Sequence, residues 1–214
     1  LGVYTTGAYE KGKWGVKSGI RIENTELNTL LTNTKEQNSQ SYANFFPSLH
    51  TSFKVTETFS LQAGYSKRIR RPRLWDLNPF FNIRNNFSIR SGNPDLQPEF
   101  TDSYELNSIY VVEKVSLNLG VFYRYTNDVI ERISTFTKPS NIGTNQASGV
   151  EFTAQYSLSK KVSFQGDFNY NLFIRTGEYE ETSFNFNGDR WSSKLTTKLK
   201  LPYQFDFEVT GQFQ

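Results

Sequence analysis

The 214-residue sequence contains no cysteine, no methionine and one histidine, His50. The absence of cysteine excludes a disulfide framework, a thiolate metal site and a cysteine nucleophile, and a single histidine argues against a multi-histidine zinc or iron site. No apolar run reaches the roughly 18 residues that a membrane-spanning helix needs. The net charge of +3 is small, so the composition gives no support to a nucleic-acid partner.

Aromatic residues, by contrast, are abundant, with 19 Phe, 12 Tyr and 3 Trp making up 16% of the chain. Many segments also alternate apolar and polar residues. In VSLNLGVFYRYT (115–126), every second residue from Val115 to Tyr125 is apolar or aromatic, and the same scheme recurs in 149–158, 162–173, 191–201 and 203–213. Because successive side chains of a strand point to opposite faces, each segment predicts a strand with one apolar and one polar face.

The alternation predicts about ten strands, at 2–10, 14–25, 43–55, 59–70, 101–112, 115–127, 146–158, 162–175, 186–201 and 203–214. Short turns are expected at 11–13, 56–58, 113–114, 159–161 and Pro202, and long polar loops near 26–42, 71–100, 128–145 and 176–185. The fold predicted is all-β: an antiparallel up-and-down meander that forms part of a transmembrane β-barrel, with short turns at one end and long loops at the other.

A soluble β-sandwich also alternates apolar and polar residues and is the main structural alternative. Three features favour the barrel. Many predicted strands have ten residues or more, the apolar faces carry almost no charge, and aromatic residues gather at the ends of those faces, as in interfacial girdles. These aromatics are Trp14, Phe45, Tyr123, Tyr125, Tyr156, Tyr170, Trp191 and Tyr203.

Catalytic and metal-binding signals are weak. His50 is expected on the polar face of its strand, and nothing marks one of the many serines as a partner nucleophile; we expect a wall histidine, no enzyme activity and no cofactor. A predicted loop contains the acidic residues Glu178, Glu180 and Glu181. We expect their carboxylates to be exposed to water, with a calcium site as the alternative. No glycine-rich phosphate loop is present.

The strongest local feature is a run of basic residues from 67 to 90, opposed by Asp76 alone. Its members are Lys67, Arg68, Arg70, Arg71, Arg73, Arg84 and Arg90. Arg68 and Arg70 are expected on the polar face, within reach of Asp102 or Glu105 on the next strand. We interpret the run first as a charge ladder that braces the inner wall of a barrel, and second as a patch that binds a plug domain or an anionic ligand.

Two motifs that flank this run resemble the TonB-dependent outer-membrane receptors of Gram-negative bacteria. YSKRIRRP (65–72) has the form YSxxIxRP, and GNPDLQPE (92–99) has the form GNPxLxPE, followed by YEL (104–106). The form RRPRLWDLNPF is most similar to the branch with a carboxypeptidase-regulatory-like front domain. The motif and luminal residues singled out as candidate sites are Arg68, Arg70, Arg71, Arg73, Asn93, Pro94, Glu99, Asp102 and Glu105.

The resemblance implies that residues 1–214 are an internal, C-terminal part of a barrel of roughly 22 strands, without its plug domain. Either the remaining strands of the barrel belong to the same molecule, or this segment closes into a barrel by itself. The implied function is energy-coupled uptake of a small nutrient such as a siderophore, vitamin or glycan. The implied partners are outer-membrane lipid, the plug, the TonB complex and a small ligand. A passive porin or structural barrel, and a soluble glycan-binding module, are the alternatives.

Overall fold

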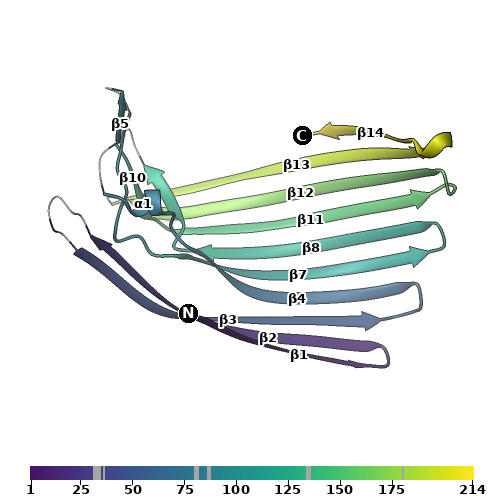
Figure 1. Ribbon diagram of the computed structural model, residues 1–214, viewed down its shortest axis with the longest axis horizontal. Helices are drawn as coiled ribbons and strands as arrows, with labels where there is room; N and C mark the ends of the chain where they lie inside the picture. The colour runs from purple at the N-terminus through teal and green to yellow at the C-terminus, as the bar shows by residue number, and fades with distance from the viewer. Residues whose placement is uncertain (31–34, 36, 80–81, 86–87, 134–135, 180) are drawn as a thin grey trace.

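The computed structural model describes the whole chain except residues 31–34, 36, 80–81, 86–87, 134–135 and 180. Ten long strands form one antiparallel sheet in the order β1-β2-β3-β4-β7-β8-β11-β12-β13-β14. In this sheet each strand lies beside the strand that precedes and follows it in the meander, as the sequence predicts. Figure 1 shows the short turns gathered at one end of the sheet and the longer connections at the other.

The strands of this sheet are longer than most strands of soluble proteins. They are β1 (Gly2–Lys11), β2 (Trp14–Leu30), β3 (Gln37–Lys54), β4 (Phe59–Arg70), β7 (Glu99–Val112), β8 (Val115–Asn127), β11 (Thr144–Ser157), β12 (Val162–Tyr179), β13 (Thr182–Lys200) and β14 (Asp206–Phe213). A 3-10 turn, Pro202–Gln204, joins the last two strands. Among the residues described, no helix has the length and apolar character needed to cross a membrane.

Two of the predicted long loops are wrong. β2 and β3 continue to Leu30 and from Gln37, and β12 and β13 continue to Tyr179 and from Thr182. The sequence signal fails there because these strand ends are mostly polar and their few apolar residues, such as Leu27 and Leu30, do not alternate. Their backbone groups nevertheless pair across the hairpin, which satisfies the hydrogen bonds that an open loop would leave to water. Glu178 therefore lies in a strand, Glu181 lies in the turn, and Glu180 falls outside the described residues.

The other two predicted loops, 71–100 and 128–145, contain secondary structure that the sequence reading missed. The first holds the short helix α1 (Leu74–Leu77) and strands β5 (Asn82–Asn85) and β6 (Ser88–Arg90); the second holds β9 (Ile130–Ile133) and β10 (Phe136–Asn141). These four strands form a second sheet in the order β5-β6-β10-β9. The two connections thus fold together at the long-loop end of the large sheet (Figure 1).

The register of the large sheet gives it one mainly apolar and one mainly polar face. Leu119 of β8 lies opposite Phe152 of β11, which lies opposite Phe168 of β12, and the alternate positions carry Asn118, Thr153 and Asp167. The apolar face is exposed, with Leu119 at 45% and Phe168 at 41% of full exposure. A soluble domain does not leave a face of this extent open to water.

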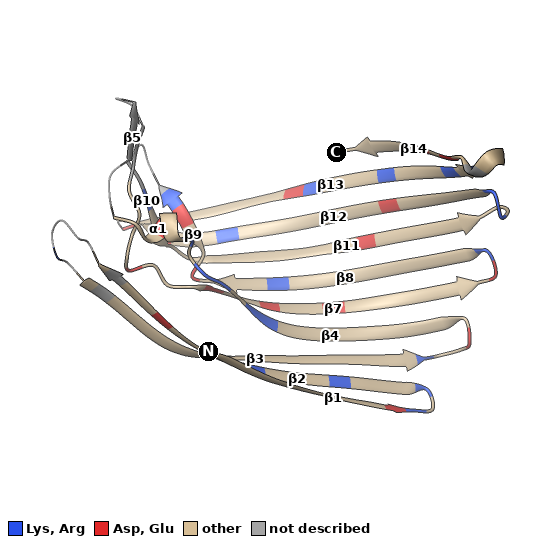
Figure 2. Ribbon diagram, viewed as in Figure 1, with Lys and Arg blue, Asp and Glu red and all other residues tan. Residues whose placement is uncertain are grey.

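The polar face is the concave one. Two hollows, of about 340 and 550 Å³, are lined mainly by residues of the polar alternation, including His50, Ser48 and Arg68. Figure 2 colours the charged residues along the strands, and among them Arg124 of β8, Glu151 of β11 and Lys194 of β13 belong to this alternation by register. The sheet is therefore a curved wall, apolar on its outside and polar and charged on its inside.

Candidate functional site

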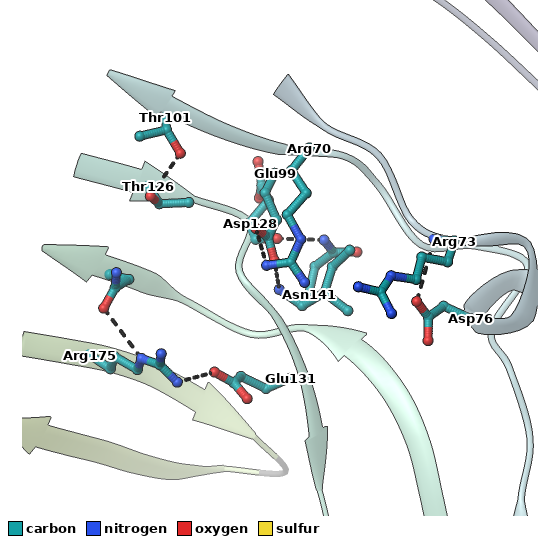
Figure 3. A network of polar contacts seen from close by, with 12 residues as sticks. Arg70, Arg73, Asp76, Glu99, Thr101, Thr126, Asp128, Glu131, Asn141 and Arg175 are labelled. Carbon is teal, nitrogen blue, oxygen red and sulfur yellow. Dashed lines mark hydrogen bonds and ion pairs between the residues drawn. The ribbon is translucent and has the colours of Figure 1, made fainter. Parts of the chain in front are cut away.

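The buried centre of the motif block is an ion pair between Arg70, at the end of β4, and Glu99, at the start of β7. Arg70 Nη1 lies 3.1 Å from Glu99 Oε2, and Glu99 is only 4% exposed. The other carboxylate oxygen, Oε1, accepts the backbone N–H of Ile130 at 2.8 Å. Glu99 thus ties the start of β9 to the large sheet, and Figure 3 shows it at the junction of the two connections.

Gly92 and Asn93 hold the first connection in a tight path. A side chain at Gly92 would place its Cβ 2.4 Å from the carbonyl oxygen of Asn78, so only glycine fits. Asn93 accepts the Asp95 N–H through Oδ1 at 3.1 Å and donates through Nδ2 to the Pro139 carbonyl at 3.1 Å. Its side chain therefore stabilises a local turn and joins that turn to β10.

Asn141 completes the contact between the connections, while Pro94 joins the first connection to β3 and Leu96 is buried beside it. The Pro94 carbonyl accepts Gln40 Nε2 of β3 at 2.6 Å, and Leu96 is 1% exposed. Asn141 accepts the Gln97 N–H through Oδ1 at 2.8 Å, and its Nδ2 donates to the carbonyls of Gln97 and Asp128 at 2.8 and 2.7 Å. We call the set Arg70, Gly92, Asn93, Leu96, Glu99 and Asn141 the loop clasp.

The predicted ion pairs of Arg68 or Arg70 with Asp102 or Glu105 are wrong, because these acidic residues have other partners. Asp102 lies opposite Lys67, on the apolar face, where its Oδ1 accepts the Tyr65 hydroxyl at 2.7 Å. Arg68 and Arg70 lie on the other face, because the period of two places them out of step with Asp102.

Glu105 does lie on the concave face, but its partner is Arg124 of β8, with Oε1 and Nη2 3.8 Å apart, rather than Arg68 or Arg70. Charged pairs do brace the concave face, but they are Arg70 with Glu99 and Arg124 with Glu105. The strand register, and not the sequence spacing, decides which charges meet.

The remaining basic residues also have identifiable surroundings. Arg71 pairs with Glu23 of β2, which raises the pKa of the Arg71 guanidinium above its usual value through a hydrogen bond to the charged form. Arg73 donates its backbone N–H to Asp76 at the start of α1, at 3.4 Å, and Asp76 also pairs with Arg132. The side chains of Arg84 and Arg90 lie outside what the structure describes.

His50 lines the 340 Å³ hollow on the concave face, beside the backbone of Gly64. Within the described residues it makes no hydrogen bond to a serine or a carboxylate. The described part of the chain likewise has no group of three or more acidic, histidine or cysteine side chains that could hold a metal ion.

The sequence reading missed several residues that hold the second connection. Gly143 has a φ of +111°, and a Cβ there would lie 2.0 Å from the Thr176 carbonyl oxygen. Arg175 of β12 reaches Glu131 of β9, with Nη1 and Oε1 2.6 Å apart (Figure 3). The NIG tripeptide, a turn signal, could have indicated Gly143, whereas no local signal links residues 131 and 175.

Comparison with known structures identifies the architecture. The chain is similar to the FrpB iron transporter from Neisseria meningitidis (13% identity, TM-score 0.64, 98% of this chain and 40% of that one). It is also similar to the siderophore receptor PirA from Pseudomonas aeruginosa (15% identity, TM-score 0.62, 100% of this chain and 46% of that one). A third similar structure is the copper transporter OprC (14% identity, TM-score 0.64, 99% of this chain and 38% of that one). Comparison with curated protein sequences gave no match.

The chain therefore spans less than half the length of these structures, and at such low identity the likeness establishes the fold alone. That fold confirms the predicted segment of a transmembrane β-barrel wall, whose exposed apolar face is the face that contacts lipid. The model of the "Outer membrane protein beta-barrel family" matches residues 1–214. With its continuous two-faced meander and this match over its whole length, the chain belongs to the outer membrane protein beta-barrel family.

Proposed function

We propose that this segment forms part of the wall of an outer-membrane receptor that takes up a small nutrient, such as a siderophore, vitamin or glycan, with energy delivered through TonB. The observation that carries the proposal is the loop clasp. It folds two long connections onto the rim of the wall through buried polar contacts centred on Glu99, which is 4% exposed. An ordered rim of this kind suits capture of a specific ligand, since a passive pore needs only an open mouth.

The similar structures support the proposal, because their titles describe iron, siderophore and copper transporters or receptors. The concave wall supports it too. Its charged side chains, such as Arg124 and Glu105, are 43% and 38% exposed, so they are available to a plug domain inside the lumen. β1 and β14 each pair on one side only within the described sheet, and lipid does not tolerate unpaired strand edges. We infer that further strands of the same protein close the barrel.

A growth and uptake experiment tests this function. The full-length protein is expressed in a Gram-negative host that lacks its own receptors, with and without a functional TonB protein, and radiolabelled iron chelates, cobalamin and oligosaccharides are supplied at low concentration. We expect uptake of one class that stops when TonB is removed or the proton gradient is collapsed. Uptake that is unchanged without TonB, together with steady conductance across a planar bilayer, would support the passive porin instead.

We further infer that the segment has no catalytic role. His50 shares its hollow with Ser52 and Glu105, but no hydrogen bond orders these groups into a nucleophile and base. A hydrolase assay with ester and phospholipid substrates on the full-length protein tests this inference. Activity that His50→Ala abolishes would contradict it.

A further inference from the structure

The 550 Å³ hollow on the concave face contains an arginine that the rest of the wall leaves uncompensated. The hollow lies across β1, β2, β3 and β4. The side chains that matter to the argument are Tyr4, Arg21, Phe46, Ser48, Ser66 and Arg68. The last two residues of this set come from the strand that leads into the loop clasp.

Arg68 differs from the other arginines of the large sheet. Arg70, Arg124 and Arg175 each have a carboxylate partner, Arg21 pairs with Glu23, and Arg190 donates to Gln214. Within the described residues Arg68 has neither an ion pair nor a hydrogen bond. The residue opposite it on β7 is Thr101, whose hydroxyl is bonded to that of Thr126 at 2.9 Å.

The floor of the hollow is built from small polar residues. Gly19 is buried, and a Cβ there would lie 2.8 Å from Ser48 Oγ, because the Ser48 hydroxyl covers this glycine and donates to its carbonyl oxygen at 3.4 Å. Ser48 lies opposite Ser66 in the register, and both hydroxyls face the same side as Arg68. Hydroxyl donors beside an exposed guanidinium are the groups that bind carboxylate or phosphate oxygens.

The wall around this floor adds charge and an aromatic surface. The guanidinium carbon of Arg21 lies 4.8 Å from the centroid of the Phe46 ring, which is 4% exposed, so Arg21 is held in place by the ring and by Glu23. Tyr4 is 76% exposed at the edge of the hollow. Arg21 and Arg71 share Glu23, and Arg70 pairs with Glu99. These three arginines and Arg68 therefore exceed their carboxylate partners by two positive charges within this described group.

We propose that this hollow is a binding site for an oxyanion group, a carboxylate or a phosphate, of a small solute in the barrel lumen. Arg68 is the residue that contacts the anion, the Ser66 hydroxyl donates a hydrogen bond to it, and Tyr4 offers a ring face to the rest of the solute. The site deepens the proposed uptake function and rests on it, since it gives the transported ligand an anionic group.

Equilibrium dialysis of the purified full-length protein in detergent tests the site, with radiolabelled citrate and inorganic phosphate as separate probes at fixed ionic strength. We expect Arg68→Ala to weaken binding of at least one probe by about tenfold or more, and Arg68→Lys by less, because lysine keeps the charge but loses the bidentate geometry. The matched control is Arg190→Ala, which removes a concave-face arginine outside the hollow and should change binding by less than about twofold.

Binding of citrate alone assigns a carboxylate ligand, and binding of phosphate assigns a phosphate ligand. The proposal is overturned if neither probe binds, or if Arg68→Ala binds as the unaltered protein does. It is also overturned if Arg68→Cys, the sole cysteine left in the full-length protein, fails to react with a charged thiol reagent added to intact cells, because the hollow is then filled by protein. Dialysis needs no energy coupling, so a failure of binding is distinct from a failure of TonB-dependent uptake.

Discussion

An arginine in place of Leu119 should destabilise the protein far more than an arginine in place of its neighbour Asn118. Both residues lie in the middle of β8, but Leu119 is on the exposed apolar face and Asn118 is on the concave face. Leu119→Arg would place a guanidinium in hydrocarbon, whereas Asn118→Arg would place it in a polar lumen.

The depth of Leu119 sets the magnitude. It lies five residues from the turn at Lys114, which is about 17 Å along an extended strand. A strand tilt of about 40° reduces this distance to roughly 13 Å along the membrane normal, close to the middle of an apolar band about 25 Å tall. An arginine at the midplane of such a barrel costs about 2–4 kcal/mol, which lowers the ratio of folded to unfolded protein by about 30- to 900-fold. The cost at residue 118 should stay below about 1 kcal/mol.

Denaturant titration of the full-length protein in lipid vesicles measures both variants, with folding followed by tryptophan fluorescence and by the gel mobility of unheated samples. Equal losses of stability for the two arginines, or a larger loss at residue 118, would refute the assignment of the faces. A loss for Leu119→Arg that persists unchanged in a short-chain detergent micelle would show that packing, and not lipid contact, is responsible.

Three further predictions concern the loop clasp and the rim. Leu96→Ala should cost about 2–5 kcal/mol, because the side chain is 1% exposed, while Leu74→Ala, at 78% exposure, should cost less than about 0.5 kcal/mol; limited proteolysis of the connections reads out both. Glu99→Gln should cost about 1–3 kcal/mol and should expose residues 128–141 to amide hydrogen exchange, and an unchanged exchange rate would contradict its bridging role. Gly143→Ala should prevent the second connection from docking, because of the φ of +111° and the close carbonyl oxygen. Gly7→Ala, with no atom within 4 Å of the new Cβ, should be tolerated, and limited proteolysis of the second connection measures both variants.

Much of the large sheet could be predicted from the sequence, because alternation is a local signal. The apolar positions of 115–126 and 162–173 identify their strands without any knowledge of partners. The signal fails at 26–30 and 176–179, where few residues are apolar and Leu27 and Leu30 fall on opposite faces of the strand. Only the cross-strand pairing shows that the strands continue there. The strands β9 and β10 were not predicted because they have only four and six residues, and β10 contains Pro139, which weakens a strand signal.

The candidate residues divide in the same way. The motif GNPxLxPE indicated that Asn93, Pro94 and Glu99 matter. The structure places Asn93 and Glu99 in hydrogen bonds between the two connections and Pro94 in a hydrogen bond with Gln40 of β3. The motif could not indicate that Glu99 would pair with Arg70, or that Asp102 would lie on the apolar face beside Tyr65. Those outcomes depend on the strand register, in which a shift of one residue exchanges the faces.

By itself the sequence determined the class of this protein: a meander of two-faced strands, apolar outside and polar inside, with an arginine-rich connection that carries a receptor-like motif. Only the tertiary structure decided which charges meet, how two distant connections fold into a second sheet, and that Arg68 alone among the described arginines of the wall has no partner. The physical reason is that face and period follow from neighbouring residues along one strand, whereas ion pairs, the loop clasp and the hollows require strands from far apart in the chain to lie side by side at a fixed register.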